Sequence, residues 1–391
     1  MNSGSSPSAP AEIAGVRFEE IPTQHGSRLG FARLNAEKSL NALAHDMIRL
    51  LDAQLRRWAA DPDIACVILH GAGEKAFCAG GDIRSLYQLL KKHPDTVPNP
   101  TALVYFTDEY RLDYLIHRYP KPLLVWGSGI VLGGGLGLMA GASHRVVTET
   151  SRIGMPEVTI GLFPDVGASW FLQRMAMRTG LFMALTGVQI NGHDAVVGGL
   201  ADYLLRSTDR DTLFARLPNA AWTTDPMENR EVLSALLREF ASQATGVMPA
   251  SNFKACEQEI QSFCRGESVA EMVSRIVRYD GDVDWLKRAS ATLAAGSPTS
   301  AVLGFELQRR TRELSLADTF RLELIVTLQC CARPDLAEGI RALLIDKDRK
   351  PQWQPRTMEK ITPQWINGHF AAPVWPDGRH PLADLENSQL A

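Results

Sequence analysis

Short apolar runs alternate with amphipathic stretches between residues 15 and 200, and this alternation constrains the fold more than any other feature of the chain. Apolar runs of strand length predict strands, and apolar residues spaced three or four positions apart predict helices. A strand-then-helix rhythm is typical of a layered α/β domain. We predict strands at residues 28–34, 65–70, 122–126 and 144–148, and helices at 41–59, 101–118 and, weakened by its glycines, 134–141.

The composition and periodicity of the sequence change after about residue 205. Helical periods rich in Ala, Leu, Arg and Glu run through residues 230–240 and 322–328, so we expect an all-helical C-terminal region packed on the α/β core. No internal repeat or low-complexity array is present. The predicted organisation is a flexible N-terminal tail at 1–14, the α/β core with the reaction site at 15–205, the helical region at 206–350 and a Pro/Trp-rich tail at 351–391.

Composition excludes several function classes. The 391 residues are 45% hydrophobic and carry a net charge of -3, which gives no global attraction for nucleic acid or an anionic membrane. No apolar run approaches the roughly 18 residues of a membrane span, and the N-terminus lacks the pattern of a signal peptide. The six cysteines and nine histidines show no metal-ligand spacing. We expect a soluble, cytoplasmic protein with reduced thiols and no metal, no nucleic-acid partner and no membrane partner.

Two carboxylates, Glu157 and Asp165, stand eight positions apart among apolar residues and glycines. About 20 residues earlier a glycine cluster, Gly133–Gly135, opens a predicted helix, and a second cluster at 79–81 follows a predicted strand. Small residues let backbone N–H groups approach a ligand oxygen, and a helix start attracts negative charge. Two sets of N–H donors near an acid/base group predict a reaction site with an oxyanion hole.

The glycines allow two other interpretations. They also suit tight turns and close helix packing without any ligand. Residues 127–132 and 135–140 each match part of the dinucleotide fingerprint. The first match lacks its third glycine because position 132 is Leu, and the second leaves too short an interval before Glu149. The pattern therefore favours an oxyanion hole over a nicotinamide site.

Three motifs, Phe77–Asp82, Gly133–Gly135 and Met155–Glu157, resemble the crotonase superfamily of acyl-CoA enzymes. The resemblance extends from about residue 19 to 370 and is strongest to the branch that hydrolyses 3-hydroxyisobutyryl-CoA in valine breakdown. It implies an α/β fold, a crotonase-like ββα-superhelix core with a helical C-terminal region. Further segments that resemble this branch are residues 40–43, 161–167, 297–300 and 338–342.

The resemblance also implies roles for individual residues. The N–H groups of Gly81 and Gly134 would form the oxyanion hole for the thioester carbonyl. Glu157 would either attack that carbonyl, giving a mixed anhydride, or activate water for the attack. Asp165 would orient the substrate hydroxyl or assist proton transfer, and Glu109 would contact substrate. On residue chemistry alone, Glu157 could instead be a surface or capping acid, Asp165 a turn residue and Glu109 a solvated acid.

Position 137 bears on the reaction type. A hydratase of this superfamily needs a further glutamate two residues after the glycine triplet, and this chain has Gly137 there. Loss of half of the acid/base pair disfavours the addition of water across a double bond. The alternatives to hydrolysis are an enoyl-CoA hydratase or isomerase, and a CoA-binding protein without turnover.

The expected ligand is an acyl-CoA, in which coenzyme A is part of the substrate, and no separate cofactor is expected. Basic residues should surround the CoA phosphates, with Arg33, Lys38, Arg84 and Lys347 as candidates. A homo-oligomer is possible, because crotonases commonly form trimers. The extended C-terminal region could instead cover the trimer surface, or cap its own active site. The predicted CoA-binding residues are Lys38, Leu40, Ala42, Ala79, Gly80, Asp82 and Ile83.

Overall fold

The computed structural model describes residues 15–94 and 96–386 and contains two sheets. The larger sheet has the strand order β1-β2-β3-β5-β7-β10, antiparallel between β1 and β2 and parallel elsewhere. The smaller sheet has the order β4-β6-β8-β9. The strands are β1 Gly15–Pro22, β2 Arg28–Asn35, β3 Ile64–Gly71, β4 Ala76–Cys78, β5 Leu123–Gly127, β6 Ile130–Leu132, β7 His144–Thr148, β8 Arg152–Gly154, β9 Ile190–Asn191 and β10 Tyr203–Leu205.

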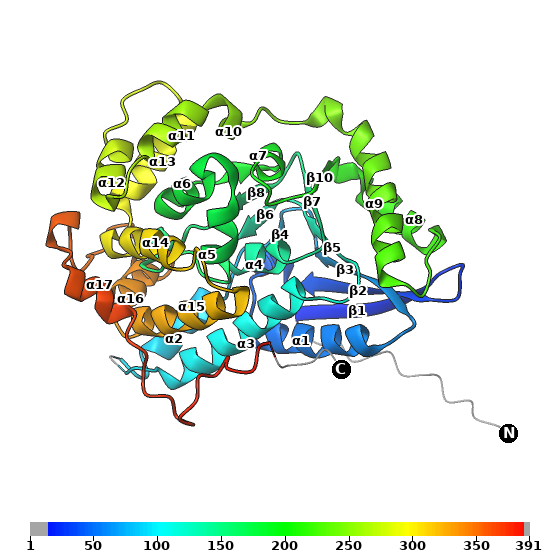
Figure 1. Ribbon diagram of the computed structural model, residues 1–391, viewed down its shortest axis with the longest axis horizontal. Coiled ribbons are helices and arrows are strands. Elements are labelled where there is room, and N and C mark those ends of the chain that lie inside the picture. Colours follow the sequence, from blue (N-terminus) through cyan, green and yellow to red (C-terminus); the bar gives the residue numbers. More distant parts are fainter. Residues whose placement is uncertain (1–14, 95, 387–391) are drawn as a thin grey trace.

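Helices enclose these sheets and are the main elements of the second half of the described chain (Figure 1). A π-helical turn, Arg341–Ile345, follows α16. The helices of the first half are α1 His45–Ala60, α2 Ile83–Leu90, α3 Pro100–His117, α4 Gly134–Ala140, α5 Ala168–Phe171, α6 Thr179–Thr186 and α7 Gly192–Val197. Those of the second half are α8 Arg210–Arg216, α9 Pro226–Gln243, α10 Asn252–Ala255, α11 Glu257–Phe263, α12 Val269–Val277, α13 Asp284–Ala295, α14 Pro298–Arg310, α15 Leu316–Cys331, α16 Pro334–Ile340 and α17 Pro363–His369.

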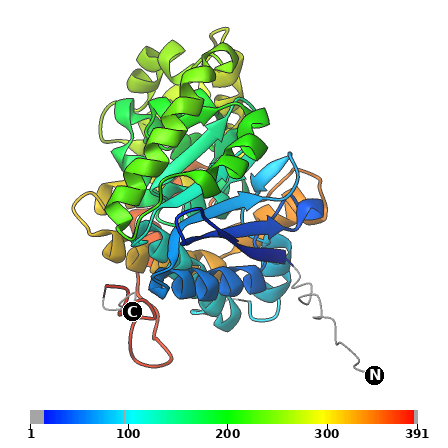
Figure 2. The same ribbon diagram turned by 90° about the vertical axis from the view of Figure 1, so that its right-hand side faces the viewer.

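The larger sheet separates two hydrophobic layers. On one face α1 buries Met47, Leu51, Leu55 and Trp58, whose spacing forms one helical stripe. On the other face α8 and α9 cover the sheet, as Figure 2 shows for the green helices. The central strand β3 is apolar and buried from residue 64 to 69, as expected of a parallel strand covered on both sides.

The predicted α/β core is confirmed, with one boundary error and several omissions. The first predicted helix starts at His45 rather than residue 41, because Leu40 and Asn41 have φ of 55° and 56°. Such left-handed residues cannot continue a right-handed helix. The sequence analysis did not predict β1, α2 or the smaller sheet, whose strands have only two or three residues each.

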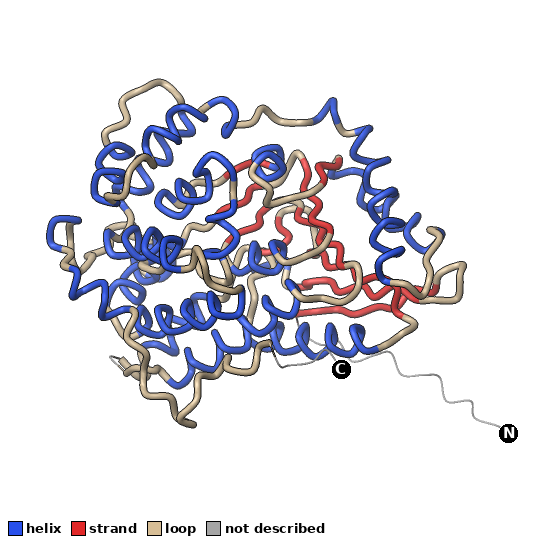
Figure 3. Tube along the Cα trace, in the orientation of Figure 1, coloured by secondary structure: helices blue, strands red, loops and turns tan. Residues whose placement is uncertain are grey.

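The predicted helical C-terminal region is also confirmed. Residues 206–386, all of which are described, contain helices and no strand (Figure 3). In this region α14 packs on α6, α15 packs on α3, and α16 packs on the 3-10 turn Glu157–Ile160. The C-terminal helices therefore contact the segment that carries the predicted acid, Glu157. None of the helices in residues 15–94 and 96–386 is both long and apolar enough to cross a membrane.

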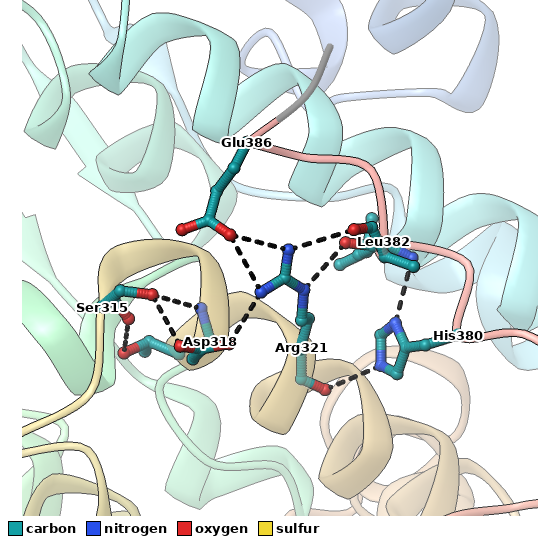
Figure 4. Close-up of polar contacts among 8 residues, drawn as sticks. Ser315, Asp318, Arg321, His380, Leu382 and Glu386 are labelled. Atoms are coloured by element: carbon teal, nitrogen blue, oxygen red, sulfur yellow. Dashed lines mark hydrogen bonds and ion pairs between the residues drawn. The ribbon is translucent and has the colours of Figure 1, made fainter.

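The last described residues dock onto α15 through one arginine (Figure 4). The Arg321 guanidinium donates from Nε to the Leu382 carbonyl at 3.0 Å and from Nη1 to Asp318 at 2.7 Å. It also pairs with Glu386 at 3.4 Å. The side chain of Leu382 is fully buried. The segment 380–386 is thus an integral part of the packing around α15.

Candidate active site

Two loops meet to bring the predicted oxyanion donors together. The loop at 40–43 pairs with the loop at 79–82, because Ala79 N–H donates to the Leu40 carbonyl and Leu43 N–H donates to the Gly80 carbonyl. A Cβ atom built at Gly134 would lie 3.6 Å from the Gly81 nitrogen. Neither N–H donates to another group of the described chain, so both are available to a ligand oxygen. The two backbone donors predicted to form an oxyanion hole therefore lie close together.

Glu157 opens the 3-10 turn after β8 and points at the glycine cluster. A Cβ atom at Gly133 would lie 2.8 Å from Glu157 Oε1, so a side chain at 133 would displace the carboxyl group. Glu157 is buried, and its Oε2 has no hydrogen-bond partner among the described residues. Burial, the Asp165 charge and the Glu109 charge raise the pKa of Glu157 well above its ordinary value. A buried acid oxygen without a partner beside a cavity is suited to act on a bound ligand.

Asp165 is buried like Glu157 but has a partner. Its carboxylate accepts a 2.8 Å hydrogen bond from the Tyr110 hydroxyl of α3, which also lies 2.8 Å from the Thr327 hydroxyl of α15. Burial raises the pKa of Asp165 to about 6, and the Tyr110 hydrogen bond opposes this rise. Asp165 is thereby poised near neutral pH, where a carboxylate can exchange protons.

Glu109 and Asp113 add two more buried carboxyl groups on one face of α3. Burial and the Asp165 charge raise the pKa of Glu109 well above its ordinary value. Both oxygens of Asp113 are buried without a partner in the described chain, and burial with the Glu109 charge raises its pKa as well. Each charged carboxyl group in this cluster disfavours ionisation of its neighbours.

Glu323 of α15 supports the segment that follows Asp165. Its two carboxylate oxygens accept hydrogen bonds from Gly167 N–H at 2.7 Å and Ser169 N–H at 2.9 Å. Burial raises the pKa of Glu323 to about 8, although these bonds oppose the rise. The C-terminal region therefore fixes the backbone beside the site.

Glu109, Glu157 and Asp165 face a cavity of about 130 Å³. Its mouth includes Leu343, an exposed residue of the π-helical turn. The C-terminal region packs closely against the segment that follows Glu157. A side chain at Gly161 would overlap the Asp335 backbone, and one at Gly339 would overlap Ile160. Eight predicted site residues line this cavity: Ala79, Gly80, Gly81, Ile83, Glu109, Gly134, Glu157 and Asp165.

The other predicted CoA-binding residues lie outside the cavity lining. Lys38 is exposed on a 3-10 turn, and Leu40 and Ala42 belong to the loop that pairs with 79–82. Asp82 caps α2, accepting hydrogen bonds from Ser85 N–H at 3.2 Å and the Ser85 hydroxyl at 2.6 Å. Their contacts with CoA stay predictions.

The basic candidates for the CoA phosphates are dispersed. Arg84 and Lys347 are exposed, whereas Arg33 lines a different cavity on the larger sheet.

Sequence reasoning missed Tyr110, although it follows Glu109 directly on a predicted helix. It also missed Leu343, for which the sequence carried no signal, since that residue lies almost 180 positions after Asp165.

Known proteins are similar to this chain in sequence, and solved structures are similar to it in fold. A family profile described as enoyl-CoA hydratase/isomerase matches residues 29–370. A Danio rerio protein named 3-hydroxyisobutyryl-CoA hydrolase, mitochondrial, is 36% identical over 362 residues, covering 91% of this chain and 89% of that protein. A carnitinyl-CoA dehydratase structure from Mycobacterium thermoresistibile is 32% identical, with a TM-score of 0.79 and coverage of 93% and 98%. An enoyl-CoA hydratase structure from Rhodobacter sphaeroides 2.4.1 is 30% identical, with a TM-score of 0.77 and coverage of 91% and 97%.

Proposed function

This chain belongs to the enoyl-CoA hydratase/isomerase family, the crotonase superfamily, and on that premise we propose that it hydrolyses the thioester of a short 3-hydroxyacyl-CoA, with 3-hydroxyisobutyryl-CoA as the preferred substrate. The name of the Danio rerio relative supports this substrate. The products are 3-hydroxyisobutyrate and free CoA, a step of valine breakdown. The cytoplasmic location stays a prediction from the sequence.

The observation that carries the proposal is the unpartnered Oε2 of Glu157 beside two free N–H donors. The ionised carboxylate attacks the thioester carbonyl, whose oxygen takes up the negative charge and is held by Gly81 and Gly134 N–H. The C–S bond then breaks, and the CoA thiolate takes up a proton. Water cleaves the mixed anhydride and restores Glu157.

The alternative course has Glu157 remove a proton from water, and the hydroxide attacks the same carbonyl. Both courses need an ionised Glu157, which must first give up its proton. Asp165 lines the same cavity, and burial raises its pKa only to about 6, so near neutral pH it is ionised and can accept a hydrogen bond from the substrate hydroxyl.

Hydration is the second candidate, because the two related structures carry hydratase and dehydratase names. The surroundings of Gly137 disfavour it. A Cβ atom at 137 would lie 2.8 Å from Val166 Cβ and 3.1 Å from Asp113 Oδ1. A second catalytic glutamate has no space there, so the acid/base pair of a hydratase cannot form.

The test is a purified-protein assay with a panel of acyl-CoAs and a free-thiol reagent. We expect CoA release from 3-hydroxyisobutyryl-CoA, and at least about 10³-fold lower kcat in Glu157→Gln, which keeps the side-chain shape but cannot act as nucleophile or base. Glu228→Gln, on the exposed start of α9, is the matched control. Absence of CoA release from every hydroxyacyl-CoA, or water addition to crotonyl-CoA, would overturn the proposal.

Hydroxylamine separates the two courses of hydrolysis. An anhydride on Glu157 reacts with hydroxylamine to give a hydroxamate, either on the protein or on the released acyl group. Formation of the acyl hydroxamate only when Glu157 is present supports the covalent course. If no acyl hydroxamate forms at hydroxylamine concentrations that leave hydrolysis intact, the result supports activation of water.

A further inference from the structure

A second cavity, of about 600 Å³, lies on the face of the larger sheet that α8 covers. Figure 1 shows β1 and β2 beside α8 at the right of the molecule. The cavity shares no lining residue with the pocket around Glu157. Ligand pockets typically measure about 300–1,000 Å³, so this space suits a small organic molecule.

Two buried polar atoms without partners stand side by side in this cavity. They are Arg33 Nε on β2 and His70 Nδ1 on β3, and neither has a hydrogen-bond partner in the described chain. Arg33 and His70 are register partners in the parallel pairing of β2 with β3. Leaving a buried polar atom unpaired costs about 1–3 kcal/mol, and most such atoms in native proteins are paired. Two adjacent ones indicate a site for a ligand.

The charges around these atoms favour an anion. Arg17 of β1 is the cross-strand partner of Arg33, and both line the cavity. Two arginines and one carboxylate, Glu19, are among the lining residues. Burial, with the charges of Arg210 and Arg33 acting in the same direction, lowers the pKa of His70 to about 4. A neutral His70 ring can donate an N–H without adding charge.

The rest of the wall is aromatic. The rings of Phe31 and Phe214 lie 5.4 Å apart, and the His70 ring lies 5.2 Å from Phe214. We propose that this cavity binds an organic anion, a carboxylate or phosphate attached to a flat apolar group. Arg33 and His70 hold the anionic head, and Phe31 and Phe214 pack against the apolar part. The site is separate from the acyl-CoA pocket.

Calorimetric titration of the full chain with benzoate, phenyl phosphate and benzamide tests the proposal. We expect saturable binding of at least one anion, at least 10-fold tighter than that of neutral benzamide. The tighter of the two anions identifies the preferred head group. Equal binding of benzamide, or no binding of either anion, would show that the cavity is an apolar or water-filled crevice and would overturn the proposal.

Variants and competition locate the site. Arg33→Gln should weaken anion binding at least 10-fold, and His70→Phe, which keeps a ring but removes Nδ1, should weaken it by a smaller factor. The exposed Arg278→Gln is the control and should bind as the parent does. Far-ultraviolet circular dichroism confirms that each variant is folded. Displacement of the anion by saturating CoA, or unchanged binding in Arg33→Gln, would contradict a separate site.

Discussion

At the scale of single residues, the site depends on how each carboxyl group is partnered. Asp165 has a hydroxyl donor and Glu157 has an oxygen without any. The two acids are equally buried, so the difference in hydrogen bonding separates their proton affinities. The Tyr110 hydrogen bond therefore favours the ionised form of Asp165, whereas no hydrogen bond to Oε2 favours the ionised form of Glu157.

Tyr110→Phe should move the acid limb of the activity profile. The Tyr110 hydroxyl stabilises the charged form of Asp165, so its removal raises the pKa of Asp165 above about 6. A hydrogen bond to a charged group is worth about 1.5–3 kcal/mol, or roughly 1–2 pH units. In kcat/KM against pH, which reports the free enzyme, the fall below about pH 6 should shift to higher pH.

The matched control is Tyr114→Phe, one turn further along α3, where no hydrogen bond to Asp165 exists. Its acid limb should coincide with that of the parent protein. Coincidence of the Tyr110→Phe limb with the parent limb would mean that Asp165 does not set the profile.

Gly137→Ala should destabilise the protein. The added methyl group would lie 2.8 Å from Val166 Cβ, and Val166 has a φ of 52°, a constrained position from which it cannot easily move. Overpacking of this kind costs about 1–3 kcal/mol, measured as the free energy of unfolding in urea. Gly246→Ala, with no atom within 4 Å of the new methyl, should change it by less than about 1 kcal/mol. Equal stability of the two variants would contradict the lack of space at 137.

Site residues in unusual sequence contexts could be predicted from the sequence, and those in common contexts could not. Glu157, Asp165 and both glycine clusters stand out because acids and glycines interrupt apolar segments. Asp113 and Glu323 occupy helix positions where an acid is commonplace, and both are buried in a region where α15 packs against α3. Burial of that kind is a tertiary property that local pattern does not encode.

At the scale of elements, the helix and strand rhythm predicted the core, but local backbone geometry determined its boundaries. The left-handed residues at 40 and 41 delay α1 and shape the loop that pairs with 79–82. The Asn41 side chain holds this loop, donating to the carbonyls of Ala72 and Ala76. Nothing in the helical periodicity of 41–59 distinguishes this arrangement from a regular first turn.

The π-helical turn after α16 is the element that closes the cavity mouth. Arg341 fixes its base through ion pairs with Glu338, Asp346 and Asp348. Leu343 then projects into the lining. This supports the prediction that the C-terminal region caps its own active site.

Leu343→Ala should weaken substrate binding more than turnover. Leu343 lines the cavity with an apolar side chain that cannot take part in the chemistry, so we expect its contacts to be the same in the ground state and the transition state. Loss of such uniform binding raises KM and leaves kcat nearly unchanged. We expect a KM several-fold higher for the acyl-CoA, in steady-state assays. Ile345→Ala is the control, because Ile345 is equally exposed at 38% but does not line the cavity. A matching KM change in both variants would contradict a specific contact.

At the scale of the whole molecule, the fold concentrates buried acids where three parts of the chain meet. Glu109 and Asp113 come from α3, Glu157 and Asp165 from the segment after β8, and Glu323 from the C-terminal region. All five are at most 6% exposed. The stability of the molecule is therefore coupled to the protonation of its active site.

Because burial raises the pKa values of these acids, the folded protein binds protons more tightly than the unfolded chain does. Their contribution to stability is complete below pH 4, near the unfolded pKa, and is lost as pH rises through each folded pKa. For Asp165 this window ends near pH 6, and for Glu323 near pH 8. The free energy of unfolding should thus fall between about pH 4.5 and 8.

Asp113→Asn should flatten this dependence, because an amide of the same shape cannot ionise. Between about pH 4 and the folded pKa of Asp113, the variant should gain up to about 1.4 kcal/mol per pH unit relative to the parent. Urea unfolding at a series of pH values measures the slope, which is independent of any constant cost of burying the amide. The exposed Asp280→Asn should give a curve parallel to that of the parent. If the Asp113→Asn curve is parallel as well, Asp113 has an ordinary pKa in the native protein, and the mutual effect of the charges in the cluster does not extend to it.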